Sequence, residues 1–131
     1  MSDRHVLDTG ALIAADRGDR RLWVHIKRAV LAGDEVTIPA AALGQAWRTR
    51  RQVLLARLLR QCLVAPLTER GARLAGELCG RSGTSDIADA AVVMTAATVG
   101  AIVWTSDPDD LSVLVAHLPR GAGPVSLRRV P

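Results

Sequence analysis

The chain has 131 residues, and 49% of them are hydrophobic, so we predict one well-packed domain over 1–131 and exclude a disordered chain. Its formal charge is +4 and its pI about 10.4, which suits a polyanionic partner such as nucleic acid. An arginine-rich coding bias explains the same charge, and the presence of a single lysine, Lys27, favours that bias as part of the cause.

The cysteines and the apolar segments indicate in which cellular compartment the protein is expected. Cys62 and Cys79 fit neither a disulfide framework nor a zinc pattern, so we expect two small apolar side chains in a reducing environment. The uncharged run 90–105 is divided at Gly100 into halves that are each too short to span a membrane. We therefore expect a cytoplasmic protein with no membrane segment.

Short apolar strands alternate with helical patterns along the chain. The first half is expected to contain strands over 5–7 and 35–39 and helices over 9–16, 19–32, 40–50 and 52–60. The second half is expected to contain strands over 62–65 and 101–105 and a weak strand over 125–127, with a loop over 80–83. Its helices are expected over 68–79, 85–99 and 107–117, and Thr84 or Ser85 is the expected cap of the long helix 85–99. This alternation predicts a three-layer α/β/α domain around a parallel sheet of four to five short strands.

Four aspartates are expected at one edge of that sheet. Asp8 directly follows the first predicted strand, and Asp107 lies just past the strand that ends at Thr105. Asp86 and Asp89 lie three residues apart at the start of the long helix, and therefore on one face of it. Ligands of open parallel sheets bind beyond the carboxyl ends of the strands, where these side chains meet.

Like charges gathered in this way repel one another unless a cation neutralises them. Mg²⁺ and Mn²⁺ prefer such hard oxygen ligands, and a bound ion of this kind can activate water against a phosphate. Each acid also has a purely structural explanation. Asp107 before Pro108 is a good helix N-cap, and Asp86 offsets a helix dipole. Asp89 is harder to explain in this way, because it interrupts an otherwise apolar run.

At these residues the chain resembles PIN-domain nucleases, and its length and charge are similar to those of VapC toxins. The resemblance rests on three motifs in the same order, which are Val6-Leu7-Asp8-Thr9-Gly10-Ala11-Leu12-Ile13, Asp86-Ile87-Ala88-Asp89-Ala90 and Trp104-Thr105-Ser106-Asp107-Pro108-Asp109-Asp110-Leu111.

The resemblance implies a PIN-like fold and an Mg²⁺- or Mn²⁺-dependent endoribonuclease, the toxin of a toxin–antitoxin pair, held inactive by a cognate antitoxin. Its catalytic metal ligands would fall on Asp8, Asp89 and Asp107. The accessory positions would be Thr9, Gln45, Asp86, Ser106 and Asp110. A homodimer is expected partly from the resemblance and partly from the surplus of apolar helix surface for so small a sheet.

The chain departs from the family pattern at Gln45, where these nucleases usually carry a glutamate. Glutamine keeps the shape and one carbonyl oxygen but removes a charge, which puts a second metal ion in question. A catalytically weak PIN-like module that acts through its antitoxin or partner complex is the alternative function.

Other candidate features carry less information. Arg48, Arg50 and Arg51 are expected to contact RNA phosphates, although a solvated helix face explains the same stretch. The histidines show no ligand spacing and are assigned structural roles, and the tryptophans are expected in the core. A flavodoxin-like or receiver domain shares acidic strand ends but needs a later lysine, for which Lys27 is misplaced.

Overall fold

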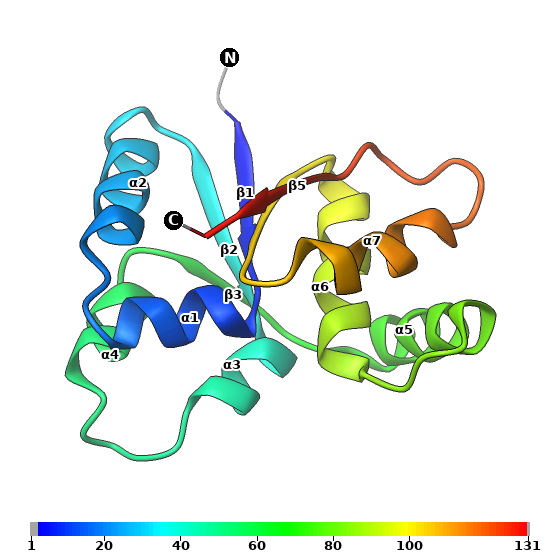
Figure 1. Cartoon of the computed structure of the whole chain (residues 1–131), viewed down its shortest axis with the longest axis horizontal. Helices are drawn as coiled ribbons and strands as arrows, with labels where there is room; N and C mark the ends of the chain where they lie inside the picture. Colours follow the sequence, from blue (N-terminus) through cyan, green and yellow to red (C-terminus); the bar gives the residue numbers. More distant parts are fainter. Residues whose placement is uncertain (1–2, 131) are drawn as a thin grey trace.

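The computed structural model describes residues 3–130 and places a parallel sheet between two layers of helices (Figure 1). The strands are β1 (Arg4–Leu7), β2 (Glu35–Pro39), β3 (Leu63–Ala65), β4 (Ile102–Thr105) and β5 (Ser126–Arg129). The helices are α1 (Thr9–Asp16), α2 (Arg20–Leu31), α3 (Ala40–Ala46), α4 (Val53–Leu59), α5 (Glu69–Ser82), α6 (Ile87–Val99) and α7 (Pro108–Ala116).

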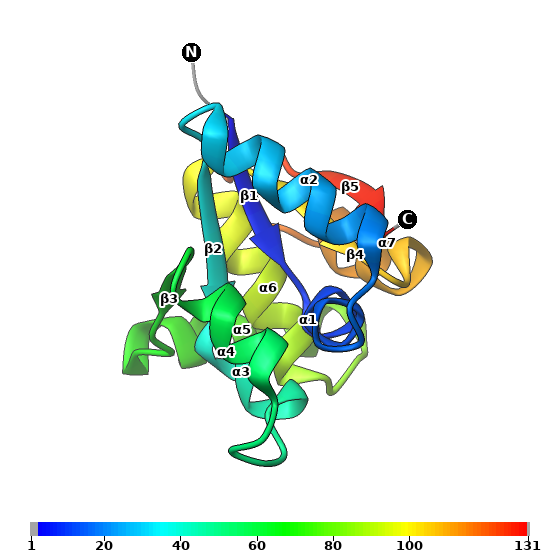
Figure 2. The same ribbon diagram turned by 90° about the vertical axis from the view of Figure 1, so that its left-hand side faces the viewer.

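The strands lie in the order β3-β2-β1-β4-β5, and every neighbouring pair is parallel. Helices α1, α2 and α4 lie on one side of this sheet and α5, α6 and α7 on the other (Figures 1 and 2). The expected three-layer α/β/α fold is therefore confirmed, with five strands in the described part of the chain. The flavodoxin-like alternative is wrong, because that fold has the strand order 2-1-3-4-5.

The core consists almost wholly of aliphatic side chains. Helix α6 crosses the sheet and contacts β1, β2 and β4. Its Ala90, Val92, Val93 and Ala96 are fully buried. An apolar run of this kind has no polar face, so it forms a helix that is covered on several sides. The tryptophans were expected in the core, but all three are only half-buried and pack against it from outside.

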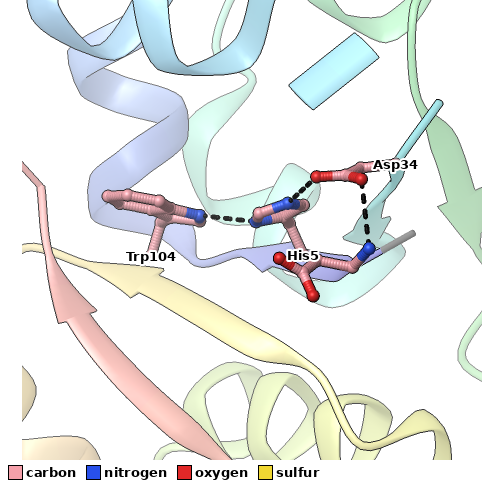
Figure 3. Close-up of polar contacts among 4 residues, drawn as sticks. His5, Asp34 and Trp104 are labelled. Carbon is pink, nitrogen blue, oxygen red and sulfur yellow. Dashed lines mark hydrogen bonds and ion pairs between the residues drawn. The ribbon is translucent and has the colours of Figure 1, made fainter. Parts of the chain in front are cut away.

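A partly buried chain of polar side chains joins the two central strands on the α2 side of the sheet (Figure 3). The indole Nε1 of Trp104 in β4 donates to Nδ1 of His5 in β1 at 3.0 Å. His5 Nε2 lies 2.8 Å from Oδ2 of Asp34 and must carry the proton, since Nδ1 accepts one. This hydrogen bond lowers the pKa of Asp34. His5 thus ties β1 to β4 and to the turn before β2, which is a structural role.

The predicted helix 40–50 was too long. Helix α3 ends at Ala46, and Trp47 has an extended backbone. The following turn is closed by Gln52, whose side-chain oxygen accepts from the backbone N–H of Thr49 at 2.9 Å and whose amide donates to Ala46 O at 2.9 Å. Local side-chain bonds of this kind compete with continued helix.

Two further boundaries differ from the predictions. The glycines of 80–83 were predicted to form a loop, but α5 continues to Ser82, whose hydroxyl donates to Leu78 O at 2.8 Å. Gly83 ends the helix in the left-handed conformation, at φ 73°. Helix α6 is capped by Asp86 and not by Thr84 or Ser85. The last strand lies over Ser126–Arg129, slightly later than predicted.

Cys62 and Cys79 are both free, and Cys79 is buried as expected while Cys62 is half-buried. Burial raises the pKa of the Cys62 thiol to about 12, so it stays protonated and poorly nucleophilic. Across residues 3–130, none of the helices combines the length and apolar character that crossing a bilayer requires.

Candidate functional site: an acidic cluster at the sheet edge

Asp8 and Asp107 lie side by side because the strands before them are neighbours. Leu7 at the end of β1 is in register with Trp104 of β4, and the backbone N–H of Asp8 donates to Trp104 O at 3.1 Å. From β1 the chain builds outward to β2 and β3, and it then returns to β4 on the other side of β1. Asp8 and Asp107 therefore lie at the topological switch point, the usual ligand position of such sheets.

Three of the aspartates cap helices, and each does so through its own Oδ1 oxygen. Oδ1 of Asp8 accepts from Ala11 N at 2.8 Å at the start of α1. Oδ1 of Asp86 accepts from Asp89 N at 3.0 Å at the start of α6, and Oδ1 of Asp107 accepts from Asp110 N at 3.2 Å at the start of α7. The capping roles considered for Asp86 and Asp107 are thus real. They also hold the three carboxylates at one edge of the sheet, because the three helices begin there.

The carboxylates are close enough to change one another's ionisation. Burial, and after it the charges of Asp86, Asp8, Asp110 and Asp107 in that order, together raise the pKa of Asp89 to about 6. The pKa of Asp110 is raised first by the charge of Asp107. These five aspartates, which we call the acidic cluster, therefore form one electrostatic unit.

Asp8 is the deepest member of the acidic cluster, with 5% of its surface exposed. Burial raises its pKa, while hydrogen bonds from the Thr105 hydroxyl and from the N–H groups of Ala11 and Gly10 oppose that rise. The charge of Asp107 raises the pKa as well. Asp8 is thus a buried carboxylate whose position is set by several donors.

The acidic cluster opens into a cavity of about 370 Å³ between α6 and α7, lined by Asp86, Asp89 and Asp110. Crowded carboxylates that repel one another are the donor set that a hard divalent cation prefers, so the residues fit Mg²⁺ or Mn²⁺ in their chemistry. Among residues 3–130, no three Asp, Glu, His or Cys side chains are already arranged around one ion position. Binding would therefore require the side chains to turn inward.

Thr105 is a site residue that the sequence analysis missed. Its side chain has no exposed surface, and its Oγ1 accepts from the backbone N–H of Asp107 at 2.9 Å while the hydroxyl bonds to the Asp8 carboxylate. A single hydroxyl thus connects the two acids that follow β1 and β4. The signal was a polar side chain at the buried end of an apolar strand, two residues before Asp107.

Replacing Thr105 with Val should lower the free energy of unfolding by about 1–3 kcal/mol, because Asp8 and the Asp107 N–H both lose a buried partner. Thr105→Ser keeps the hydroxyl and should lose only about 1 kcal/mol, the value of one buried methyl. Urea denaturation in EDTA measures the free energy of unfolding of both variants. Equal losses in the two variants would show that Thr105 acts through packing alone.

Three of the predicted accessory residues, Thr9, Gln45 and Ser106, lie near the start of α1, where Asp8 is. Thr9 Oγ1 donates to Ala42 O and to Oε1 of Gln45, both at 3.3 Å, so α3 does bring Gln45 next to the residue that follows Asp8. Ser106 lies against α1. A Cβ added to Gly10 would lie 2.0 Å from Ser106 Oγ and 2.7 Å from its Cβ.

The predicted RNA-binding arginines lie on the connection between α3 and α4. Arg48 donates from Nη1 to Gly44 O at 3.1 Å and to Trp47 O at 2.9 Å, and so closes the end of α3. Arg50 and Arg51 are exposed. In the described part of the chain, no hydrogen bond or ion pair joins these three side chains to the acidic cluster.

Comparison with known proteins identifies the fold. The chain matches VapBC2 from Rickettsia felis bound to a DNA fragment from its promoter with a TM-score of 0.71 and 13% identity, covering 98% of this chain and 99% of that one. It matches VapBC-5 from Mycobacterium tuberculosis with a TM-score of 0.55 and 22% identity, over 97% and 98% of the two chains. PAE2754 from Pyrobaculum aerophilum matches with a TM-score of 0.59 and 17% identity, over 93% and 90%.

These likenesses confirm the PIN-like fold that the three motifs predicted. They extend over nearly the whole of each chain. No protein-family model matches the sequence, and no curated protein matches it.

Proposed function

We propose that this protein is a divalent-metal-dependent endoribonuclease and the toxin of a toxin–antitoxin pair. The observation that carries the proposal is the acidic cluster, in which Asp8, Asp89 and Asp107 come together from three distant segments at the switch point of the sheet. A partly buried charge such as that of Asp89 is costly in an otherwise apolar helix, even in its first turn. The likeness to solved toxin–antitoxin proteins supports the biological role.

Asp8, Asp89 and Asp107 would hold Mg²⁺ or Mn²⁺, with Asp86 and Asp110 contributing charge beside them. When bound, the cation supplies Lewis acidity toward a phosphodiester and lowers the pKa of water. The chain's own residues prepare the site. Thr105 and the first turn of α1 fix Asp8, while Thr9 and Ser106 offer hydroxyls at the mouth of the cluster.

Gln45 lies where a further carboxylate would increase the charge of the site. With an amide there, we propose that one divalent ion binds well and a second binds poorly, because each carboxylate adds direct Coulomb attraction. The alternative function is a catalytically weak module that acts through its antitoxin or partner complex, and the missing charge at Gln45 favours it.

The partners follow from the same proposal. An RNA substrate, a cognate antitoxin, a homodimer and a cytoplasmic location are all proposed here, with 1–131 acting as one domain. Large apolar side chains remain exposed on Leu31 (77%), Val53 (63%) and Leu63 (57%), which is surface that a protein partner would cover. Light scattering of the purified protein tests the dimer.

Cleavage of labelled structured RNA tests the activity. We expect products with Mg²⁺ or Mn²⁺ and none with EDTA, and activity should return when the metal is restored. Asp89→Asn purified in the same way should lose cleavage, which controls for contaminating nuclease, while Glu77→Gln removes an exposed acid on α5 and should cleave normally. Cleavage that persists in EDTA would contradict metal dependence, and a metal-loaded protein that cleaves no RNA would leave the binding module as the function.

A further inference from the structure

A second cavity lies beside the acidic cluster. It has a volume of about 420 Å³, and its walls include Gly10 and Ser106. Gly10 follows Asp8 by two residues and Ser106 directly precedes Asp107, so the cavity and the cluster share a wall. Its other walls come from the end of α1 and from the end of β5, the edge strand next to β4 (Figure 1).

This cavity is cationic, in contrast to the acidic one. Arg17 and Arg129 line it, together with one acid, Asp19, whose Oδ1 is occupied by Leu22 N at 3.1 Å. Among the described residues, neither guanidinium is in an ion pair. Arg129 donates from Nη1 to Ser106 O at 3.3 Å, which holds it next to the cluster and leaves other donors available.

An RNA strand that enters the acidic cluster brings a negative charge with every phosphate. One bound cation compensates the phosphate at the cluster, but the neighbouring phosphate also needs a positive partner. The cavity lined by Asp86, Asp89 and Asp110 has no cationic residue among its lining residues. Guanidinium groups match phosphate oxygens with paired hydrogen bonds, and 420 Å³ is within the range of cavities that bind small ligands.

We propose that Arg17 and Arg129 form a subsite for the RNA phosphate next to the scissile one, with the strand running from this cavity across Asp8 and Asp107. The subsite deepens the proposed function and rests on it for its substrate. It is distinct from the Arg48–Arg51 stretch, which lies on another connection. The position of the cavity lined by Arg17 and Arg129 therefore determines on which side of Asp8 and Asp107 the RNA strand continues.

Binding of a fluorescein-labelled single-stranded RNA, measured in EDTA over a range of salt concentrations, tests the subsite without requiring metal or cleavage. The double variant Arg17→Gln/Arg129→Gln should bind about tenfold more weakly than the wild type, and its salt slope should be shallower by about 0.7, the value of one neutralised phosphate on a single strand. Arg70→Gln removes an exposed arginine of α5 and should change neither quantity.

The subsite is overturned if the double variant matches Arg70→Gln in affinity and slope, or if it lowers the affinity for an acidic peptide and not for RNA. Arg17→Lys/Arg129→Lys keeps both charges and should restore the slope, which guards against misfolding of the Gln variant. Inorganic phosphate at the same ionic strength should compete with RNA for the wild type more than for the Gln variant. A changed slope in a protein that never cleaves RNA would support the subsite and refute the nuclease.

Discussion

Asp89→Asn should make the metal-free protein more stable at pH 7 while removing both its stabilisation by metal and its activity. The folded pKa of Asp89 is raised from 3.8 to about 6, so the stability that the protonated side chain provides below pH 4 is lost as the pH rises through 6. The cost of the ionised form is about 1–2 kcal/mol, after allowance for the partial exposure of this side chain. Asparagine avoids this cost.

Thermal melts from pH 4 to 8 in EDTA measure the effect. The wild type should lose several degrees of melting temperature between pH 4 and pH 7, about 3–6 °C for a domain of this size, while Asp89→Asn should lose less. The exposed Glu77→Gln should follow the wild type. Identical pH profiles for Asp89→Asn and the wild type would mean that Asp89 is not destabilised by its neighbours.

The same variant separates stability from function. A saturating divalent ion should stabilise the wild type by about 2.7 kcal/mol at a hundredfold excess over its Kd and should barely affect Asp89→Asn. Cleavage should fall by roughly 10²–10³-fold, the usual effect of removing one preorganised charged group from a reacting centre. A variant that is less stable than the wild type at neutral pH and equally active would refute the metal site.

Gly10→Ala should destabilise the protein by about 1–3 kcal/mol, as overpacking of a tight contact does. Helix propensity alone predicts the opposite sign, since alanine inside α1 is worth roughly 1 kcal/mol more than glycine. The contact decides the outcome, because the new methyl would meet Ser106 Cβ at 2.7 Å, and moving that atom means moving the backbone between β4 and α7. That backbone carries Asp107, so metal affinity and cleavage should fall as well.

Substitutions of Ser106, the residue that the new methyl would meet, supply the control. Gly10→Ala/Ser106→Gly removes both the Oγ and the Cβ that the methyl would strike and should recover most of the lost stability. Gly10→Ala/Ser106→Ala removes only the hydroxyl and should recover little. Chemical denaturation in EDTA measures all four proteins. If Gly10→Ala alone is more stable than the wild type, α1 and the Ser106 loop are not held in contact.

Local patterns were sufficient for the strands and for the position of most helices. Alternation of apolar strands with helices predicted the three-layer sheet, and Asp8 and Asp107 were predicted at the end of the sheet where they lie, but the pairing of the strands before them was not. Boundaries failed where a side chain overrides the local pattern. Gln52 closes a turn that shortens α3, and the Ser82 hydroxyl and Gly83 allow α5 to continue through glycines that predicted a loop.

The sequence by itself determined which chemistry is available, because Asp8, Asp89 and Asp107 are carboxylates at positions where apolar residues or simple caps would otherwise serve. Only the tertiary structure decided how they act together. The raised pKa of Asp89, the Thr105 hydroxyl between Asp8 and Asp107, and the cavity that joins Arg17 to Arg129 all depend on atoms from segments far apart in the chain. Coulomb and hydrogen-bond energies depend on distances of a few ångströms, and residue spacing along a chain does not specify such distances between separate elements.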